Sequence, residues 1–210
     1  MKITWYGHSC FLVETAEGSA VLDPYAPGSV PGLTLPPLEA DLVLCSHEHR
    51  DHGYRQGVRL TGRTPAVRVE TLSTWHDERG GALRGPNTVH VLEAEGLRLA
   101  HLGDLGHRLS PEQLRALGRV DILLIPVGGY YTIGPDTAAA LARDIAPKIT
   151  VPMHYRGPGF GYEVIGPAEA FLRQFDPVLD LTDNVLRPET LETPCAVHLR
   201  CPASRGSNTQ

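Results

Sequence analysis

The chain has 210 residues, 41% of them hydrophobic and 20% charged, and a formal net charge of -5 at pH 7. These values are typical of one globular domain with a sizeable core, and the acidic balance excludes a protein built to grip nucleic acid broadly. The N-terminus is too polar for a signal peptide and no stretch approaches the ~20 apolar residues of a membrane-spanning helix, so we expect a cytoplasmic protein that binds neither nucleic acid nor membrane.

Short apolar runs alternate with turn residues through the first half of the chain, which predicts strands joined by loops. The expected strands are Cys10–Val13, Ala20–Leu22, Leu42–Cys45, Ala66–Val69, Thr71–Trp75, Thr88–Leu92 and Leu97–Leu102. The last two flank Glu95-Gly96, a pattern that predicts a hairpin. The Pro- and Gly-rich segment 24–37 is expected to be a loop.

The second half of the chain has an α/β pattern. A helix is expected from Ser110-Pro111-Glu112-Gln113 to about Gly118, because Ser is a good N-cap and Pro a good first residue. The remaining expected elements are the strand Asp121–Pro126, the helix Pro135–Ile145, the strand Ile149–Met153, the helix Pro167–Phe175 and an edge strand at Ala196–Arg200. We expect one domain over residues 1–201 and a disordered tail over residues 202–210.

Three of the expected strands are followed within two residues by an ionisable side chain. The first run ends at His47, the second at Asp104 and the third at His154. Because α/β proteins build sites from the carboxyl ends of their strands, we expect these three residues to share one site.

The run His47-Glu48-His49-Arg50-Asp51-His52 places three imidazoles and one ligand-type carboxylate in six residues. In a loop these side chains can diverge, so that one pair faces one metal ion while the other pair faces a second. Nitrogen and oxygen donors suit Zn, Mn or Fe better than Cu(I) or an iron–sulfur cluster.

This run resembles the H-x-H-x-D-H motif of the metallo-β-lactamase superfamily, and in particular its small, single-domain branch of ascorbate-phosphate lactonase-like and uncharacterised Zn-dependent hydrolases. Further matching phrases are Trp5-Tyr6-Gly7-His8-Ser9, Leu22-Asp23-Pro24, His101-Leu102-Gly103-Asp104-Leu105-Gly106, Pro126-Val127-Gly128-Gly129 and Pro152-Met153-His154-Tyr155. The resemblance implies an α/β fold, a four-layer αβ/βα sandwich with the metals at one edge between two sheets.

The resemblance also implies the ligands of two divalent metal ions, Zn in the first place, with Mn or Fe as alternatives. The first ion is expected at His47, His49 and His76; the second at Asp51, His52 and His154; and Asp104 is expected to bridge them.

Other polar residues are expected beside the metals or away from them. His8, Asp23 and His107 are expected to support the site or to touch substrate, and the segment 128–132 to form a loop beside it. His90, His101 and His198 lie within strand patterns and are expected to be structural.

The implied chemistry is hydrolysis of an ester, lactone, amide or phosphodiester by a hydroxide generated at the dinuclear centre, with Asp51 orienting the nucleophile. Residues 50–84 contain seven Arg against four acidic residues, which favours a small anionic substrate. An iron-dependent oxygenase on the same fold is the alternative, and a non-catalytic binding module is disfavoured because all seven ligand positions are filled. A homo-oligomer is compatible with these features.

Overall fold

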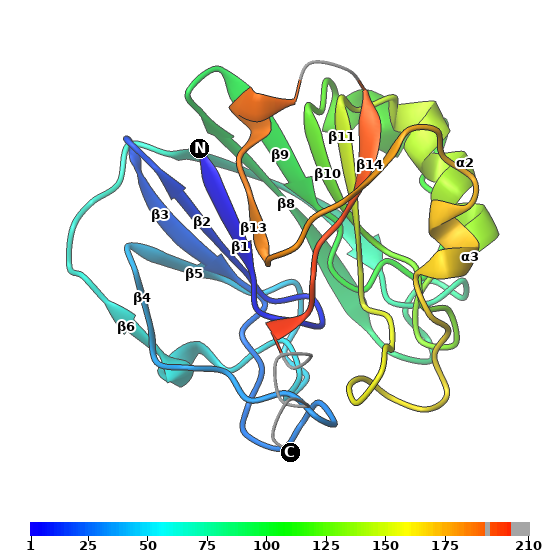
Figure 1. Ribbon diagram of the computed structural model, residues 1–210, viewed down its shortest axis with the longest axis horizontal. Coiled ribbons are helices and arrows are strands. Elements are labelled where there is room, and N and C mark those ends of the chain that lie inside the picture. The colour runs from blue at the N-terminus through cyan, green and yellow to red at the C-terminus, as the bar shows by residue number, and fades with distance from the viewer. Residues whose placement is uncertain (192–193, 203–210) are drawn as a thin grey trace.

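Two β-sheets face each other in the computed structural model, which describes residues 1–191 and 194–202 (Figure 1). The five-stranded sheet has the order β13-β1-β2-β3-β5, and the seven-stranded sheet has the order β12-β14-β11-β10-β9-β8-β7. The first consists of β1 (Lys2–Trp5), β2 (Phe11–Thr15), β3 (Gly18–Leu22), β5 (Leu42–Leu44) and β13 (Val185–Leu186). The second consists of β7 (Arg68–Trp75), β8 (Pro86–Ala94), β9 (Leu97–His101), β10 (Ile122–Pro126), β11 (Ile149–Met153), β12 (Val178–Asp180) and β14 (Cys195–His198).

The helices lie against the seven-stranded sheet. They are α1 (Pro111–Leu117), α2 (Pro135–Ile145) and α3 (Glu169–Leu172), and α2 and α3 cover the outer face of that sheet (Figure 1). A two-stranded sheet of β4 (Leu38–Ala40) and β6 (Val58–Leu60) and the 3-10 turns η1 (Arg55–Gly57) and η2 (Pro188–Thr190) complete the described elements. The predicted α/β sandwich is confirmed, although within the described ranges no α-helix precedes Pro111, so its helical layer lies on one side.

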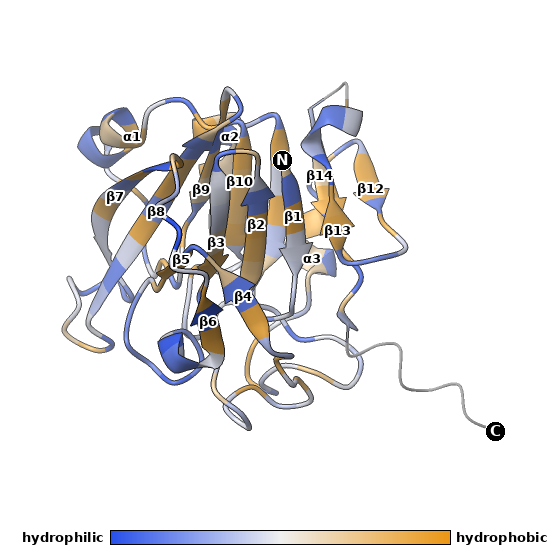
Figure 2. Ribbon diagram, turned by 90° about the vertical axis from the view of Figure 1, so that its left-hand side faces the viewer, coloured by the Kyte–Doolittle hydropathy of each residue, from blue (hydrophilic) through white to orange (hydrophobic). Residues whose placement is uncertain are grey.

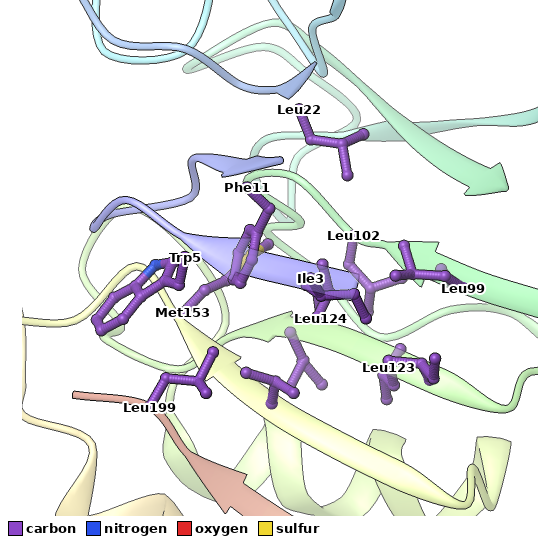
Figure 3. Close-up of a cluster of buried hydrophobic side chains, with 14 of the residues drawn as sticks. Ile3, Trp5, Phe11, Leu22, Leu99, Leu102, Leu123, Leu124, Met153 and Leu199 are labelled. Carbon is purple, nitrogen blue, oxygen red and sulfur yellow. The ribbon is translucent and has the colours of Figure 1, made fainter. Parts of the chain in front are cut away.

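The hydrophobic core fills the space between the two sheets (Figure 3). Ile3 and Phe11 point into it from the five-stranded sheet, and Leu99 and Met153 from the seven-stranded sheet, all without solvent exposure. Fully burying one such side chain stabilises the fold by roughly 1.5–3 kcal/mol. β10, which is buried along its whole length and hydrophobic up to its last residue, lies at the centre of the larger sheet (Figure 2).

Several elements agree with the sequence-based expectations. α2 has the expected bounds, and α1 begins with a capping box in which Ser110 accepts from the Gln113 backbone and Gln113 accepts from the Ser110 backbone. The β8–β9 hairpin turns at Glu95 and Gly96, both with positive φ.

Other elements differ from the expectations. The two strands expected between residues 66 and 75 are one strand, β7, because eight consecutive residues pair with β8 regardless of their side chains. The strand expected at 196–200 corresponds to β14. The prediction that it lies at the edge of its sheet is wrong, because β12 pairs with β14 on its outer side. α3 is shorter than expected, and β1, β4, β6, β12 and β13 had no predicted counterpart.

The direction of the strands brings their carboxyl ends to one side of the molecule. β9, β10 and β11 are parallel, and β7 has the same direction because it is two antiparallel pairings away from β9. In the other sheet β3 and β5 are also parallel. The loops that follow β5, β7, β9 and β11 therefore meet where the two sheets come together.

Two expectations concern matters beyond these elements. The predicted disordered tail falls, apart from Pro202, on residues 203–210, which lie outside the described residues. No helix in the described ranges is long and apolar enough to span a bilayer, and the cytoplasmic address stays a prediction.

Candidate metal centre

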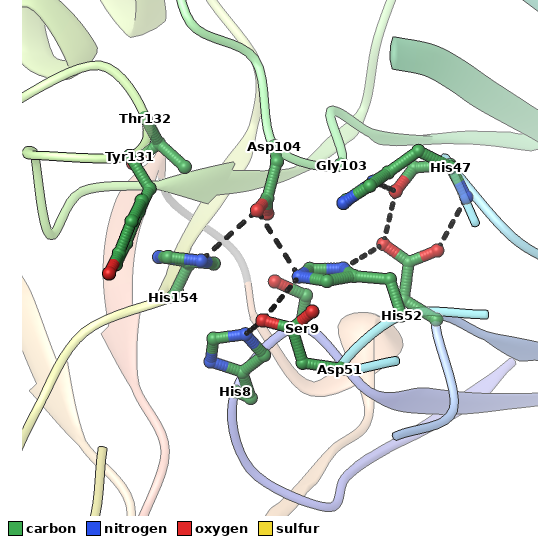
Figure 4. Close-up of polar contacts among 12 residues, drawn as sticks. His8, Ser9, His47, Asp51, His52, Gly103, Asp104, Tyr131, Thr132 and His154 are labelled. Atoms are coloured by element: carbon green, nitrogen blue, oxygen red, sulfur yellow. Dashed lines mark hydrogen bonds and ion pairs between the residues drawn. The ribbon is translucent and has the colours of Figure 1, made fainter. Parts of the chain in front are cut away.

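The predicted ligand residues converge from four strand ends. The loop after β5 carries four of them, and one each follows β7, β9 and β11. Figure 4 shows five of the seven, His47, Asp51, His52, Asp104 and His154. They are His47, His49, Asp51, His52, His76, Asp104 and His154. All but His49 and Asp51 are buried, so these two lie on the open side of the site.

These side chains form two groups joined by one carboxylate. The ligand atoms of His47, His49 and His76 lie within 4.8 Å of one another. Oδ2 of Asp104 is 3.2 Å from Nε2 of His76 in this group. The same oxygen is 3.2 Å from Nε2 of His52 and 3.1 Å from Nε2 of His154, on the other side. Asp104 therefore faces both groups at once.

The unpartnered atoms at this point fit divalent metal ions. Nε2 of His47, Nε2 of His52 and Oδ1 of Asp104 are buried and have no hydrogen-bond partner among the described residues. Leaving such atoms unpaired inside a protein costs roughly 1–3 kcal/mol each. Ligands bound at about 2.0–2.1 Å to one tetrahedral ion lie about 3.3–3.4 Å apart, which is close to the separations around Asp104. Donor types and spacing both suit Zn, Mn or Fe.

Asp23 holds two of the imidazoles in place from behind. The parallel register pairs Leu22 with Leu44, which brings Asp23 beside Ser46. Asp23 accepts hydrogen bonds from the Ser46 backbone (2.6 Å), the Ser46 hydroxyl (2.6 Å) and Nδ1 of His52 (2.8 Å). Because the Ser46 hydroxyl donates to Asp23, its oxygen accepts from Nδ1 of His47 at 2.9 Å. Both imidazoles therefore present Nε2 to the site, and Asp23 lies where it supports the site, as expected.

The charges of the centre stabilise one another. Burial raises the pKa of the Asp104 carboxyl, but His154 and His52 outweigh burial and hold that pKa well below its ordinary value. Burial and the nearby His52 lower the pKa of His47 to about 3, so its ring is neutral. Burial alone lowers the pKa of His52, but Asp104 and Asp23 raise it well above the ordinary value. Without a metal, His52 therefore keeps a proton that a metal ion has to displace.

Asp51 is held by a tyrosine that is distant in the sequence. Its Oδ2 lies 3.1 Å from the hydroxyl of Tyr162, which also lies 2.6 Å from the carbonyl oxygen of Ser29. Burial raises the pKa of Asp51, but the His8 and His52 imidazoles hold it below the ordinary value, so the carboxylate is ionised. Tyr162 was not identified from the sequence, because nothing in the local pattern connects it with a residue 111 positions earlier.

The loop after β10 borders the first group of histidines. Nδ1 of His76 donates to the carbonyl oxygen of Tyr131 at 3.1 Å, which leaves Nε2 for the site. A Cβ added to Gly106 would lie 2.4 Å from the carbonyl carbon of His76, so only glycine allows this close approach. The expectation that residues 128–132 form a loop beside the site is confirmed.

The remaining histidines are held by hydrogen bonds away from the centre. His101 donates to the carbonyl oxygen of Ser9, and His90 to that of Cys45. His198 pairs with an exposed aspartate. Both ring nitrogens of His107 bond to backbone atoms: one accepts from Trp75 and the other donates to the carbonyl oxygen of Arg108. His107 belongs to none of the groups that could hold a metal in the described ranges.

Most of the basic stretch is neutralised by neighbouring carboxylates. Four of its seven arginines form ion pairs: Arg55 with Glu48, Arg59 with Glu39, Arg63 with Asp41 and Arg68 with Glu70. The excess of positive charge counted along the sequence is therefore largely balanced by residues outside or within the segment.

Arg84 stands apart, because it lines a cavity of about 340 Å³ next to the first group. Its guanidinium donates to the carbonyl oxygen of Tyr130 at 3.0 Å and lies over the ring of Tyr131, 5.6 Å from its centre. Glu78 and His107 line the same cavity. The cavity adjoins the site through Tyr131, whose carbonyl oxygen holds His76.

Comparisons with known proteins agree with this geometry. A family model described as the β-lactamase superfamily domain matches residues 2–154, which include every predicted ligand. A UPF0173 metal-dependent hydrolase of Archaeoglobus fulgidus is 30% identical over 74% of this chain and 83% of the relative. A UPF0173 protein of Pyrococcus abyssi is 31% identical over 83% of this chain and 90% of the relative. A crystal structure from Thermotoga maritima, described as a candidate Zn-dependent hydrolase of the metallo-β-lactamase superfamily, is 34% identical, covers 95% of this chain and 99% of that one, and has a TM-score of 0.74.

Proposed function

The chain belongs to the β-lactamase superfamily and, within it, to the UPF0173 metal-dependent hydrolases, and from this premise we propose that it cleaves a small anionic ester, lactone or phosphodiester with two divalent metal ions. The observation that carries the proposal is the position of Asp104. One oxygen of this carboxylate lies within 3.2 Å of imidazole nitrogens from both groups of histidines. A site for one metal ion would not need imidazole donors on both sides of this carboxylate.

The residues divide between two sites. We define the first metal site as His47, His49 and His76, and the second metal site as Asp51, His52 and His154, with Asp104 facing both. Zn is the ion we propose, and the same nitrogen and oxygen donors also accept Mn or Fe. Divalent ions held there would lower the pKa of a water molecule to about 7 and polarise the scissile carbonyl or phosphoryl group.

The protein's own side chains position the water nucleophile and accept its proton. Asp51 is ionised, is 19% exposed in its side chain, and is fixed by the Tyr162 hydroxyl at 3.1 Å. It can therefore orient the water nucleophile from the open side and accept its proton. His49, which is also exposed, lies on the same open side, where substrate enters.

The anionic substrate is supported by Arg84 alone among the arginines described above. An Arg side chain can bind phosphate or carboxylate oxygens through two parallel hydrogen bonds. In the cavity beside the first metal site, the Arg84 guanidinium is kept in place by the Tyr130 carbonyl and the Tyr131 ring, and among the described residues it is not paired with a carboxylate. An acidic group of the substrate in this cavity would be bound next to the metals.

The first experiment is metal analysis of natively purified protein, together with a screen of phosphodiester, lactone and thioester substrates. We expect two Zn ions per chain and hydrolysis of at least one anionic substrate. One ion per chain would contradict the dinuclear centre. Iron with substrate-dependent oxygen consumption, and no hydrolysis, would favour the oxygenase alternative instead.

The second experiment tests the substrate class with Arg84→Ala. A charged hydrogen bond contributes roughly 1.5–3 kcal/mol, so KM for an anionic ester should rise about ten- to a hundredfold. KM for a matched neutral ester and the metal content should stay the same. Arg63→Ala is the matched control, because the exposed Arg63 side chain is paired with Asp41. Preference for neutral esters, unaffected by Arg84→Ala, would rule out the anionic substrate.

A further inference from the structure

His8 is a buried imidazole whose ring nitrogens both lack a hydrogen-bond partner. It follows β1 and Gly7, lies outside the H-x-H-x-D-H run, and is 1% exposed. Nδ1 and Nε2 are both buried without a partner among the described residues. Burying a polar ring in this way is unfavourable unless something else satisfies its nitrogen atoms.

The backbone holds His8 at this place against its own preference. Its φ of 51° lies in the left-handed region, which a side chain other than glycine rarely adopts. Two hydrogen bonds to its carbonyl oxygen fix the turn: the Trp5 indole donates at 3.0 Å and the His154 backbone at 3.2 Å. His154 itself has a φ of 52°. Strained residues of this kind persist where the surrounding structure fixes them, often at functional sites.

The ring of His8 lies among residues of the second metal site. Its ligand atom and those of His52 and His154 lie within 4.8 Å of one another. The ring centres are 4.2 Å apart for His8 and His154, and 4.9 Å apart for His8 and His52. In Figure 4 the ring points towards the carboxylate of Asp51.

The distance to Asp51 distinguishes two roles for His8. Nε2 of His8 is 3.4 Å from Oδ2 of Asp51. A charge-assisted hydrogen bond between such groups is typically about 2.7–2.9 Å long. Two ligands of one five-coordinate metal ion with bonds of about 2.0–2.1 Å are roughly 2.9–3.6 Å apart, depending on the angle between the bonds. The observed separation matches the second case.

We infer that His8 is a further protein ligand of the second metal site, binding through Nε2 beside Asp51, His52, Asp104 and His154. The inference rests on the proposed dinuclear centre. It gives the second site five protein donors and the first site four, so that open coordination positions for water and substrate are concentrated at the first site. This asymmetry agrees with the exposure of His49 and with the cavity beside His76.

The test compares metal-free and Zn-loaded full-length protein in wild type, His8→Ala and His8→Gln. Zn content is measured after dialysis, Zn affinity by competition with a chelator, and the thermal midpoint by calorimetry. We expect wild type to hold two Zn ions and both variants to bind Zn at the second metal site at least tenfold more weakly. Because the ring has no partner without metal, the variants should lower the midpoint of the loaded protein more than that of the metal-free protein.

His90→Ala is the matched control. His90 is also a buried histidine, but it donates to the carbonyl oxygen of Cys45 and belongs to no group that could hold a metal in the described ranges. Its replacement should lower both midpoints equally and leave Zn affinity unchanged. The same equal loss for His8→Ala, or wild-type affinity in that variant, would overturn the inference. Full rescue by His8→Gln would also overturn it, since Gln can donate a hydrogen bond to Asp51 as a merely positioning histidine would.

A measurement on wild-type protein tests the inference even if the variants do not fold. In protein labelled with 15N-histidine, the Nε2 resonance of His8 should shift once two equivalents of Zn have been added, and a resonance that stays unshifted refutes the inference. The failures are distinguishable: wild type that binds fewer than two Zn ions contradicts the proposed dinuclear centre as well. Wild type with two ions and an unshifted His8 contradicts only the role of His8.

Discussion

Replacing Asp23 with Asn should weaken metal binding without touching a metal ligand. Asp23 has no solvent exposure and accepts three hydrogen bonds, two from Ser46 and one from His52. Asn has nearly the same shape, but its amide nitrogen cannot accept. At least one buried donor therefore loses its partner, at a cost of roughly 1–3 kcal/mol to the free energy of unfolding.

The effect on metal binding follows from the same bonds. If the amide nitrogen introduced by Asp23→Asn takes the place of Oδ2, Nδ1 of His52 faces a donor and its ring is no longer held with Nε2 towards the site. Loss of such a supporting carboxylate typically lowers metal affinity about ten- to a hundredfold, or about 1.4–2.7 kcal/mol. Chelator competition measures the affinity, and denaturant unfolding of metal-free protein measures the stability.

Asp41→Asn is the matched control for this prediction. Asp41 is also a buried aspartate that accepts several hydrogen bonds, from Ser19, Thr61 and Arg63. It precedes β5, whereas the site follows β5, so the two aspartates lie at opposite ends of the strand. Asp41→Asn should reduce stability and leave metal affinity unchanged. If Asp23→Asn binds both ions with wild-type affinity, the supporting role assigned to Asp23 is wrong.

Three further predictions test other parts of the centre. Asp51→Ala should abolish turnover at saturating metal while leaving the thermal midpoint of metal-free protein nearly unchanged, because no core strand depends on this carboxylate; near wild-type turnover would contradict its role. Gly106→Ala should weaken Zn binding at the first site, because the new Cβ would lie 2.4 Å from the backbone of His76. Gly134→Ala is the control and should leave Zn binding unchanged, because a Cβ at that position has no atom within 4 Å. Equal Zn affinities of the two variants would contradict this prediction. In metal-free protein burial lowers the pKa of His52, but Asp104 and Asp23 raise it well above the ordinary value. Zn has to displace the proton that His52 carries below this pKa. The affinity for Zn should therefore rise about tenfold per pH unit up to the raised pKa and level off above it. Calorimetric titrations in buffers of different ionisation enthalpy would count the proton released, and a value of zero at neutral pH would refute the assignment.

The raised pKa of His52 has a second consequence, for the stability of the metal-free protein. Its folded-state pKa lies above the unfolded value of about 6.5. The contribution to stability is therefore fully present below that unfolded value and is lost as pH rises through the folded-state pKa. Denaturant unfolding of metal-free wild type and His52→Gln, as a function of pH, should show this loss in wild type alone.

The sequence by itself determined the parts of this protein that depend on neighbouring residues. The capping box at Ser110, the limits of α2 and the hairpin at Glu95-Gly96 follow from local backbone and side-chain preferences, which act over a few residues. The ligand-rich run His47–His52 is equally local, and it was sufficient to indicate the family. The expectation that polar residues at strand ends meet depends only on strands being parallel, and the structure brings all seven predicted ligands together.

The tertiary structure decided which side chains pair with which. Tyr162 reaches Asp51, and Arg63 is neutralised by Asp41, because loops distant in the sequence pack together. The place of β14 inside its sheet was likewise set by β12, whose three residues carry too little pattern to be recognised. His8 could be expected near the site, but only the facing of the two sheets placed its unpartnered ring against His154. Contacts of this kind depend on the position of whole sheets relative to each other, which residue spacing along one segment does not encode.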